Sequence, residues 1–114
     1  MADLMAVNGW RVMWLIAVFD CPVKTKPQRK AATNFRKSLL KENFMQYQYS
    51  IYLRHFPTLA SANAEIELLK YGVPKGGNVS FFILTDKQYG MTREFLGHIS
   101  IKRAPMAPDQ LQLF

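Results

Sequence analysis

The chain has 114 residues, of which 49% are hydrophobic and 13% aromatic, so its composition is that of one folded domain and excludes a disordered chain. Fifteen basic and eight acidic residues give a formal net charge of +7. The apolar run over residues 12–19 is far shorter than the roughly 20 residues of a membrane-spanning helix, and no Lys or Arg precedes Arg11 as a signal peptide would require. We expect a cytoplasmic protein with one domain over residues 1–103 and a tail over residues 104–114.

The first predicted strand covers residues 11–19, because Val, Ile, Trp and Phe are enriched there without alternation. A strand of this kind is typically covered on both faces. Asp20 follows directly, and Cys21-Pro22 ends the strand. A carboxylate beside such a run must be solvated, paired or bound to a cation. Asp20 is therefore the first candidate site residue, although it could also serve only as a strand-end hydrogen-bond acceptor.

A basic helix is predicted next. Thr25 and Gln28 have the spacing of a capping box, an apolar stripe follows at three-to-four spacing, and Asn43 is the expected stop. Eight basic residues and one acidic residue lie between residues 21 and 57, which accounts for the whole net charge. This excess favours contact with a phosphate backbone over a merely solvated helix face. The predicted nucleic-acid-binding residues are Lys24, Lys26, Arg29, Lys30, Arg36, Lys37 and Arg54.

Residues 44–56 alternate between two faces, which predicts either one strand or two short strands joined by a turn near residues 48–50. The alternation places Ser50, Tyr52 and Arg54 on the polar side. Tyr52 is a candidate supporting residue for a site on this side, whereas a strand hydroxyl such as that of Ser50 commonly bonds locally.

Three more elements are expected after Pro57. They are a helix over residues 58–71 that buries Leu59, Ala62, Ile66 and Leu69, an apolar strand over residues 79–85, and a last short strand within residues 93–102. The order predicts an α+β fold, a ferredoxin-like split β-α-β sandwich with an extra C-terminal strand and both helices on one face of the sheet. Because two main strands look apolar on both faces, we expect a homodimer packed through the open sheet faces.

A set of ordered motifs over residues 12–90 resembles one known family, the small CRISPR-associated adaptation protein Cas-two, in the form found beside type II effectors. Each motif is short, but their order and spacing are fairly specific. They are FDCPV at 19–23, RK at 29–30, NFRK at 34–37, LL at 39–40, NF at 43–44, QYSIY at 48–52, PKGGNV at 74–79 and TDKQY at 85–89.

The resemblance implies a homodimer that bridges two dimers of the integrase Cas-one and holds double-stranded DNA for insertion into a CRISPR array. It also implies that Asp20 binds Mg²⁺ or another divalent cation in an endonuclease site that two copies share, with Ser50 in a supporting role. The cation would relieve the repulsion between two facing carboxylates. Because no second carboxylate lies near Asp20 in the sequence, we favour a scaffold over an enzyme that cuts DNA or RNA.

Two other functions share this order of elements. An RNA-binding domain of the RRM kind would carry a Lys-Gly pair followed by exposed aromatics, and residues 75–82 keep the pair and Phe82 but lack two of those aromatics. A ribonuclease toxin of similar fold would use a dimeric Asp20 site to cut RNA. A monomer would favour the first alternative, and metal-dependent RNA cleavage the second. The tail over residues 104–114 is either a partner-binding segment or a frayed end.

Overall fold

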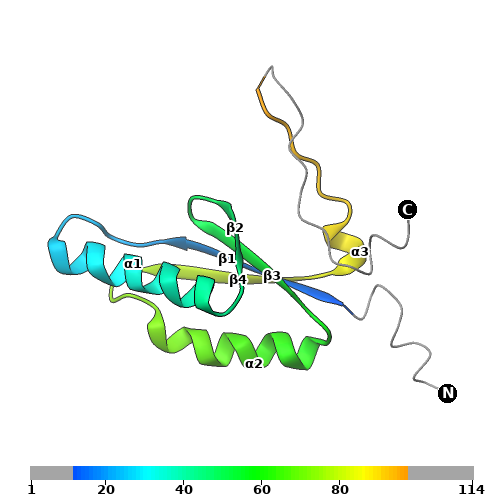
Figure 1. Ribbon diagram of the computed structural model, residues 1–114, viewed down its shortest axis with the longest axis horizontal. Helices are drawn as coiled ribbons and strands as arrows, with labels where there is room; N and C mark the ends of the chain where they lie inside the picture. Colours follow the sequence, from blue (N-terminus) through cyan, green and yellow to red (C-terminus); the bar gives the residue numbers. More distant parts are fainter. Residues whose placement is uncertain (1–11, 98–114) are drawn as a thin grey trace.

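The computed structural model describes residues 12–97, and its four strands form one antiparallel sheet in the order β2-β3-β1-β4. Helices α1 and α2 cover one face of this sheet (Figure 1). The arrangement confirms the predicted α+β, ferredoxin-like fold class. The elements are β1 (Met13–Asp20), α1 (Lys26–Lys41), β2 (Met45–Gln48), β3 (Ile51–Phe56), α2 (Leu59–Leu69), the short 3₁₀ helix η3 (Lys70–Gly72), β4 (Asn78–Thr85) and α3 (Asp86–Tyr89).

The main core lies between the sheet and the two helices. Alternate residues of β1, namely Leu15, Ala17 and Phe19, are buried there because successive strand side chains point to opposite faces. They meet the buried stripe of α1, where the ring of Phe35 stands edge-on to that of Phe19 at a centroid distance of 5.3 Å. The helix side of β1 is thus fully covered by the chain itself.

Helix α1 begins and ends as its sequence predicts. The Thr25 hydroxyl accepts from the backbone N–H of Gln28, and the Gln28 side chain accepts from the N–H of Thr25, which confirms the capping box. At the other end Asn43 has a φ of 67°, a left-handed conformation that Asn tolerates and that stops the helix. These two signals set the length of the basic helix.

The predicted polar side of β3 is wrong. Residues 44–56 do form two strands joined by a turn, but the register shifts between Gln46 and Gln48. Tyr52 pairs with Ala17 and Arg54 with Leu15, so both side chains lie on the helix side of the sheet. Tyr52 is only 2% exposed. The alternation itself is kept, because Leu53 shares a face with Met45 and Tyr52 with Gln46. The face that carries Tyr52 and Arg54 is the one that the helices cover, whereas Ile51 and Leu53 lie on the open face.

Helix α2 also departs from its predicted face. Ala62 and Leu69 are buried as expected and Ile66 packs against the core, but Leu59 is half exposed. The buried position in the middle of the helix is taken by Glu65 instead. An acidic residue is not counted in an apolar stripe, which is why the pattern of apolar residues missed it.

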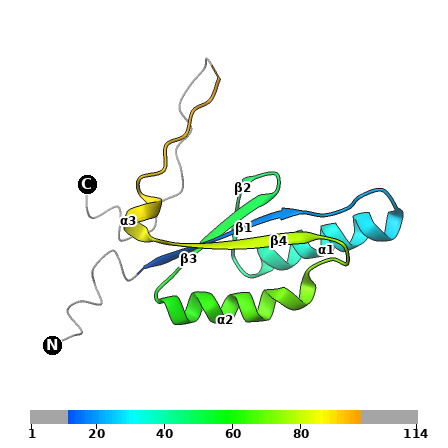
Figure 2. The ribbon, with the colours of Figure 1, turned by 180° about the vertical axis from the view of Figure 1, so that it is seen from behind.

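The chain covers one end of the open sheet face itself. Residues 86–89 form α3, which follows β4 and lies at the end of the sheet remote from the start of α1 (Figure 2). There Trp14 is fully buried, its indole N–H donates to the Asp86 carboxylate at 2.7 Å, and the Tyr89 ring stacks on it at a centroid distance of 4.0 Å. A second copy is therefore not needed to cover this end.

A short last strand was predicted within residues 93–102, and the described part of that range, residues 93–97, contains no strand. The remainder of that prediction, residues 98–102, lies outside the described residues. So do the predicted tail over residues 104–114 and the ends of the domain predicted over residues 1–103.

Candidate functional site

Asp20 is the last residue of β1, and its side chain is exposed on the open face of the sheet. The preceding residue, Phe19, points into the helix-side core, so Asp20 points the other way. The register places Asp20 directly opposite Asn78, the first residue of β4, which is also exposed. Directly opposed residues of antiparallel strands lie side by side on one face, so an amide and a carboxylate share this corner.

Two loops and a turn meet at the same edge of the sheet. The backbone N–H of Phe19 donates to the Ser50 carbonyl at 3.1 Å, so the β2–β3 turn lies beside the end of β1. A Cβ on Gly77 would lie 3.0 Å from the Cys21 sulfur, which is a tight contact, so glycine favours close packing of the loop before β4 against the one after β1. This close approach brings Asn78 next to Asp20. Burial raises the pKa of the Cys21 thiol, and the nearby Arg36 opposes that shift.

One copy of the chain does not supply a complete metal site. Within residues 12–97 no three His, Cys, Asp or Glu side chains come together. The oxygen atoms at this edge, from Asp20, Asn78 and Ser50, are the hard donors that Mg²⁺ prefers. The residues therefore fit such an ion only where a second copy adds its own carboxylate. Asn78 was missed from the sequence, because only the strand register places it beside Asp20.

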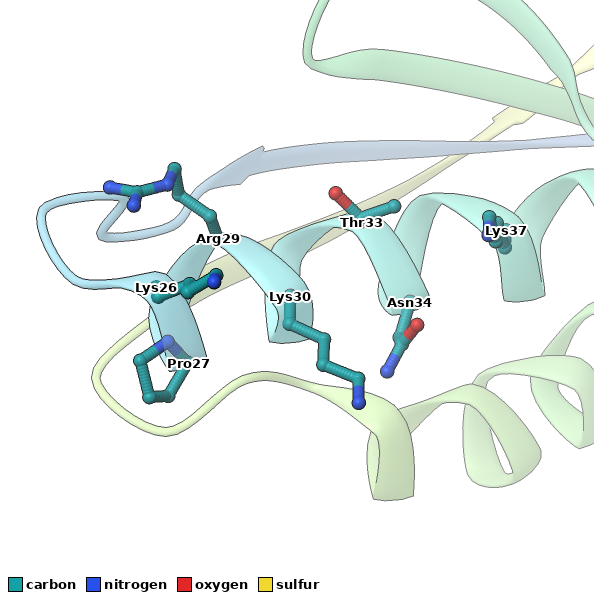
Figure 3. A pocket seen from close by; sticks show the side chains of 7 residues that line it. All are labelled: Lys26, Pro27, Arg29, Lys30, Thr33, Asn34 and Lys37. Atoms are coloured by element: carbon teal, nitrogen blue, oxygen red, sulfur yellow. The ribbon is translucent and has the colours of Figure 1, made fainter.

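A cationic surface lies on the outer side of α1, away from the sheet (Figure 3). Its centre is a hollow of about 650 Å³, along which Arg29 and Thr33 point to the side of the β2–β3 hairpin and Lys30 and Asn34 to the opposite side. The residues that line the hollow are Lys26, Pro27, Arg29, Lys30, Thr33, Asn34 and Lys37. Four of the seven predicted nucleic-acid-binding residues thus meet at one place.

The other three predicted basic residues have different surroundings. Lys24 is exposed in the loop before α1, where the Arg29 guanidinium donates to its carbonyl at 3.1 Å. Arg36 lies over the ring of Tyr49 at 4.6 Å. Arg54 is used inside the protein, donating to the Glu42 carbonyl at 2.8 Å and lying 3.8 Å from the Glu65 carboxylate. We therefore leave Arg54 out of the cationic surface.

Tyr52 has no place in the site either. Its ring is buried beside Phe19, with a centroid distance of 5.7 Å, on the helix side of the sheet. Asp20 points to the opposite side, so the two side chains do not share a face. Ser50 keeps its position next to the end of β1 through its backbone carbonyl.

On the part of the open face that α3 does not reach, an apolar patch is left uncovered by residues 12–97. Ile16 lies between Phe82 and Leu53 in the register, and Val18 pairs with Ile51. Phe82 is 54% exposed, which is high for a ring in the middle of a strand. This open-face patch, formed by Ile16, Val18, Ile51 and Phe82, extends to Asp20 at the strand end.

Within residues 12–97 no helix is both long and apolar enough to cross a bilayer.

Comparison with known proteins adds independent information. A family model described as CRISPR associated protein Cas2 matches residues 13–92. The chain is 43% identical over 108 residues to the CRISPR-associated endoribonuclease Cas2 of Paracidovorax avenae, covering 95% of this chain and 99% of that protein. It is 41% identical to the protein of the same name from Parvibaculum lavamentivorans, covering 90% and 100%, and 33% identical to that from Flavobacterium psychrophilum, covering 95% and 93%.

Proposed function

The chain belongs to the CRISPR-associated Cas2 family, named Cas-two above, and from this membership we propose that it is a homodimeric subunit of CRISPR adaptation. In this role it bridges dimers of the integrase Cas-one and binds double-stranded DNA for spacer acquisition. The observation that carries the proposal is the open-face patch, which ends at Asp20 and which no described part of the chain covers.

Dimerisation through this patch follows from its chemistry. Apolar side chains such as Phe82 and Ile16 gain free energy when a second surface removes them from water, by about 25 cal/mol for each Å². A two-fold axis brings the same patch from both copies together. It also brings the two Asp20 carboxylates toward each other, which is the arrangement that a divalent cation would stabilise.

DNA binding is assigned to the outer side of α1, because the helix layer separates it from the dimerising face. Lys26, Lys30 and Lys37 lie along the hollow, and no aromatic residue is among the residues that line it. Positive side chains without base-reading partners contact phosphates and carry no sequence preference. The surface therefore suits a duplex backbone of any sequence.

Metal-dependent cleavage of RNA is the second candidate, and the name endoribonuclease that the relatives carry favours it. A bound Mg²⁺ would polarise a phosphate and activate water. In that case Asp20 holds the ion, and Asn78 and Ser50 orient the groups around it. We favour the scaffold, because each copy offers one carboxylate and His55 lies at the other end of the sheet, 5.2 Å from the ring of Trp14.

One set of measurements separates the two. Light scattering after size exclusion gives the mass of the full chain alone and with Cas-one, and duplex binding and RNA cleavage are measured with Mg²⁺. The variants are Asp20→Ala and the triple variant Lys26→Ala/Lys30→Ala/Lys37→Ala. A scaffold joins Cas-one as a dimer and keeps duplex binding in Asp20→Ala, while the triple variant weakens it at least tenfold. A dimer that ignores Cas-one and cuts RNA only with Asp20 intact would instead establish the nuclease.

A further inference from the structure

Tyr49 presents an aromatic ring to solvent in the turn between β2 and β3. Its side chain is 71% exposed, and the guanidinium of Arg36 lies 4.6 Å from the ring centroid. Arg36 itself is half-buried, and its Nε is buried and donates to no group within residues 12–97. The guanidinium is thus held against one face of the ring, while the large exposed fraction of Tyr49 leaves much of its surface to solvent.

The ring is located between the two parts of the candidate site. On one side, the next residue in the turn, Ser50, accepts from the N–H of Phe19, one residue before Asp20. On the other side, Arg36 follows Thr33 by three residues on α1, and residues three apart are neighbours on a helix surface. Because Thr33 lines the cationic hollow, the arginine that holds Tyr49 lies one helical turn from that hollow.

We propose that Tyr49, with Arg36 behind it, is a stacking platform for an unpaired nucleobase of the nucleic acid bound to the cationic surface. The proposal rests on the proposed nucleic-acid binding. Phosphates are attracted by the lysines of α1, but they do not need an aromatic ring. Every nucleobase has a π-face that stacks on an exposed aromatic side chain, and an arginine on the opposite face strengthens and orients such a platform.

The ligand is a base outside a duplex, because paired bases are stacked on one another and cover their π-faces. A peptide partner is disfavoured by charge, since the eight basic residues around this turn between residues 21 and 57 are accompanied by one acidic residue. Such a balance attracts a polyanion. The platform therefore binds an unpaired base next to a phosphate backbone and does not distinguish one type of base from another.

Tyr71 provides a matched control within the same chain. It is 82% exposed, and Lys70 lies over its ring at 5.3 Å, so it is also an exposed tyrosine with a cation nearby. Lys70, however, is paired with Glu67 at 2.6 Å, and Tyr71 lies in η3 after α2 rather than in the β2–β3 turn beside the end of β1.

The experiment measures the affinity of the full chain for three labelled ligands by fluorescence anisotropy. The ligands are a blunt duplex, the same duplex with a single-stranded extension, and that extension made abasic so that it keeps its phosphates and loses its bases. The wild type is expected to bind the base-bearing extension more tightly than the abasic one by about tenfold. Tyr49→Ala should abolish this difference, Tyr49→Phe should keep it, and Tyr71→Ala should leave it unchanged.

Failure of this proposal is distinguishable from failure of the proposed function. If Tyr49→Ala discriminates between the two extensions as well as the wild type does, the platform is overturned while duplex binding stands. If the wild type binds the blunt duplex but prefers neither extension, the platform is likewise overturned and duplex binding stands. Loss of binding to all three ligands by the wild type would overturn both proposals. Because Tyr49 is exposed, its variants should fold, which circular dichroism verifies.

Discussion

Glu65 is an acidic residue in a buried position, whereas glutamate is normally exposed to solvent. It is 9% exposed, and one of its carboxylate oxygens is buried without a hydrogen-bond donor within residues 12–97. Burial, the charge of Glu42 and a hydrogen bond with that residue raise the pKa of Glu65, while Arg54 lowers it. A proton on Glu65 would remove the repulsion between its carboxylate and that of Glu42, which is the physical reason for the raised pKa.

This environment makes the stability of the protein pH-dependent. A carboxyl group whose pKa is raised on folding contributes its stability below its unfolded pKa and loses it as pH rises through the folded pKa. We therefore expect Glu65→Gln, which is neutral at all pH values, to raise the melting temperature by a few degrees near pH 7, equivalent to about 1 kcal/mol. The gain should disappear near about pH 4, where the wild-type carboxyl is protonated.

Thermal unfolding of the two proteins across this pH range checks the prediction. Glu67→Gln is the control, because Glu67 is exposed and forms only a surface pair with Lys70. A destabilised Glu65→Gln at neutral pH would show that Arg54 needs the ionised carboxylate, which would contradict a raised pKa of Glu65.

At the level of elements, α3 is a short helix of four residues that depends on a tertiary anchor. Asp86 is 1% exposed and accepts from the indole N–H of Trp14, which is itself fully buried. The capping box formed by Thr85 and Gln88 starts the helix, but so short a helix gains little from its own hydrogen bonds. The contact with Trp14 is what holds α3 over the end of the sheet.

Asp86→Ala should therefore destabilise the protein by about 2–3 kcal/mol, because it leaves the buried indole N–H without an acceptor. The intrinsic fluorescence of Trp14 should shift to longer wavelength as α3 loosens, and chemical denaturation gives the free energy of unfolding. Lys87→Ala, an exposed change in the same helix, serves as the control. An unchanged stability in Asp86→Ala would mean that water replaces the carboxylate without cost.

For the whole molecule, the open-face patch determines the oligomeric state that we propose. Phe82 lies at its centre, opposite Ile16 in the register. Placing a charge there would require burial of an unpaired carboxylate in a dimer, which costs several kcal/mol. Phe82→Asp should therefore be monomeric, and its apparent dissociation constant should rise by at least a hundredfold.

Light scattering over a range of concentrations measures this change. Leu68→Asp is the matched control, because Leu68 is 58% exposed on α2, in the helix layer rather than on the open face. If Leu68→Asp dissociates the dimer and Phe82→Asp does not, the interface lies on the helices, and the open face has another partner.

Local sequence patterns are enough to predict the order of the elements over residues 12–89, the capping box at Thr25, the stop at Asn43 and the position of Asp20 at a strand end. Each of these features is set by residues that are close together in the chain, so a local sequence pattern is enough to predict it. The excess of positive charge on the segment that contains α1 could also be predicted, because it depends only on the amino-acid composition of that segment.

Which of the two strand faces meets the helices depends on tertiary packing. Tyr52 and Arg54 lie on the face that the helices cover, and strand pairing brings Asn78 beside Asp20 across 58 positions of the chain. The contacts between Arg36 and Tyr49 and between Trp14 and Asp86 are likewise non-local. A period-two pattern separates the two faces of a strand but does not say which face the helices cover, because this is set by packing between distant segments.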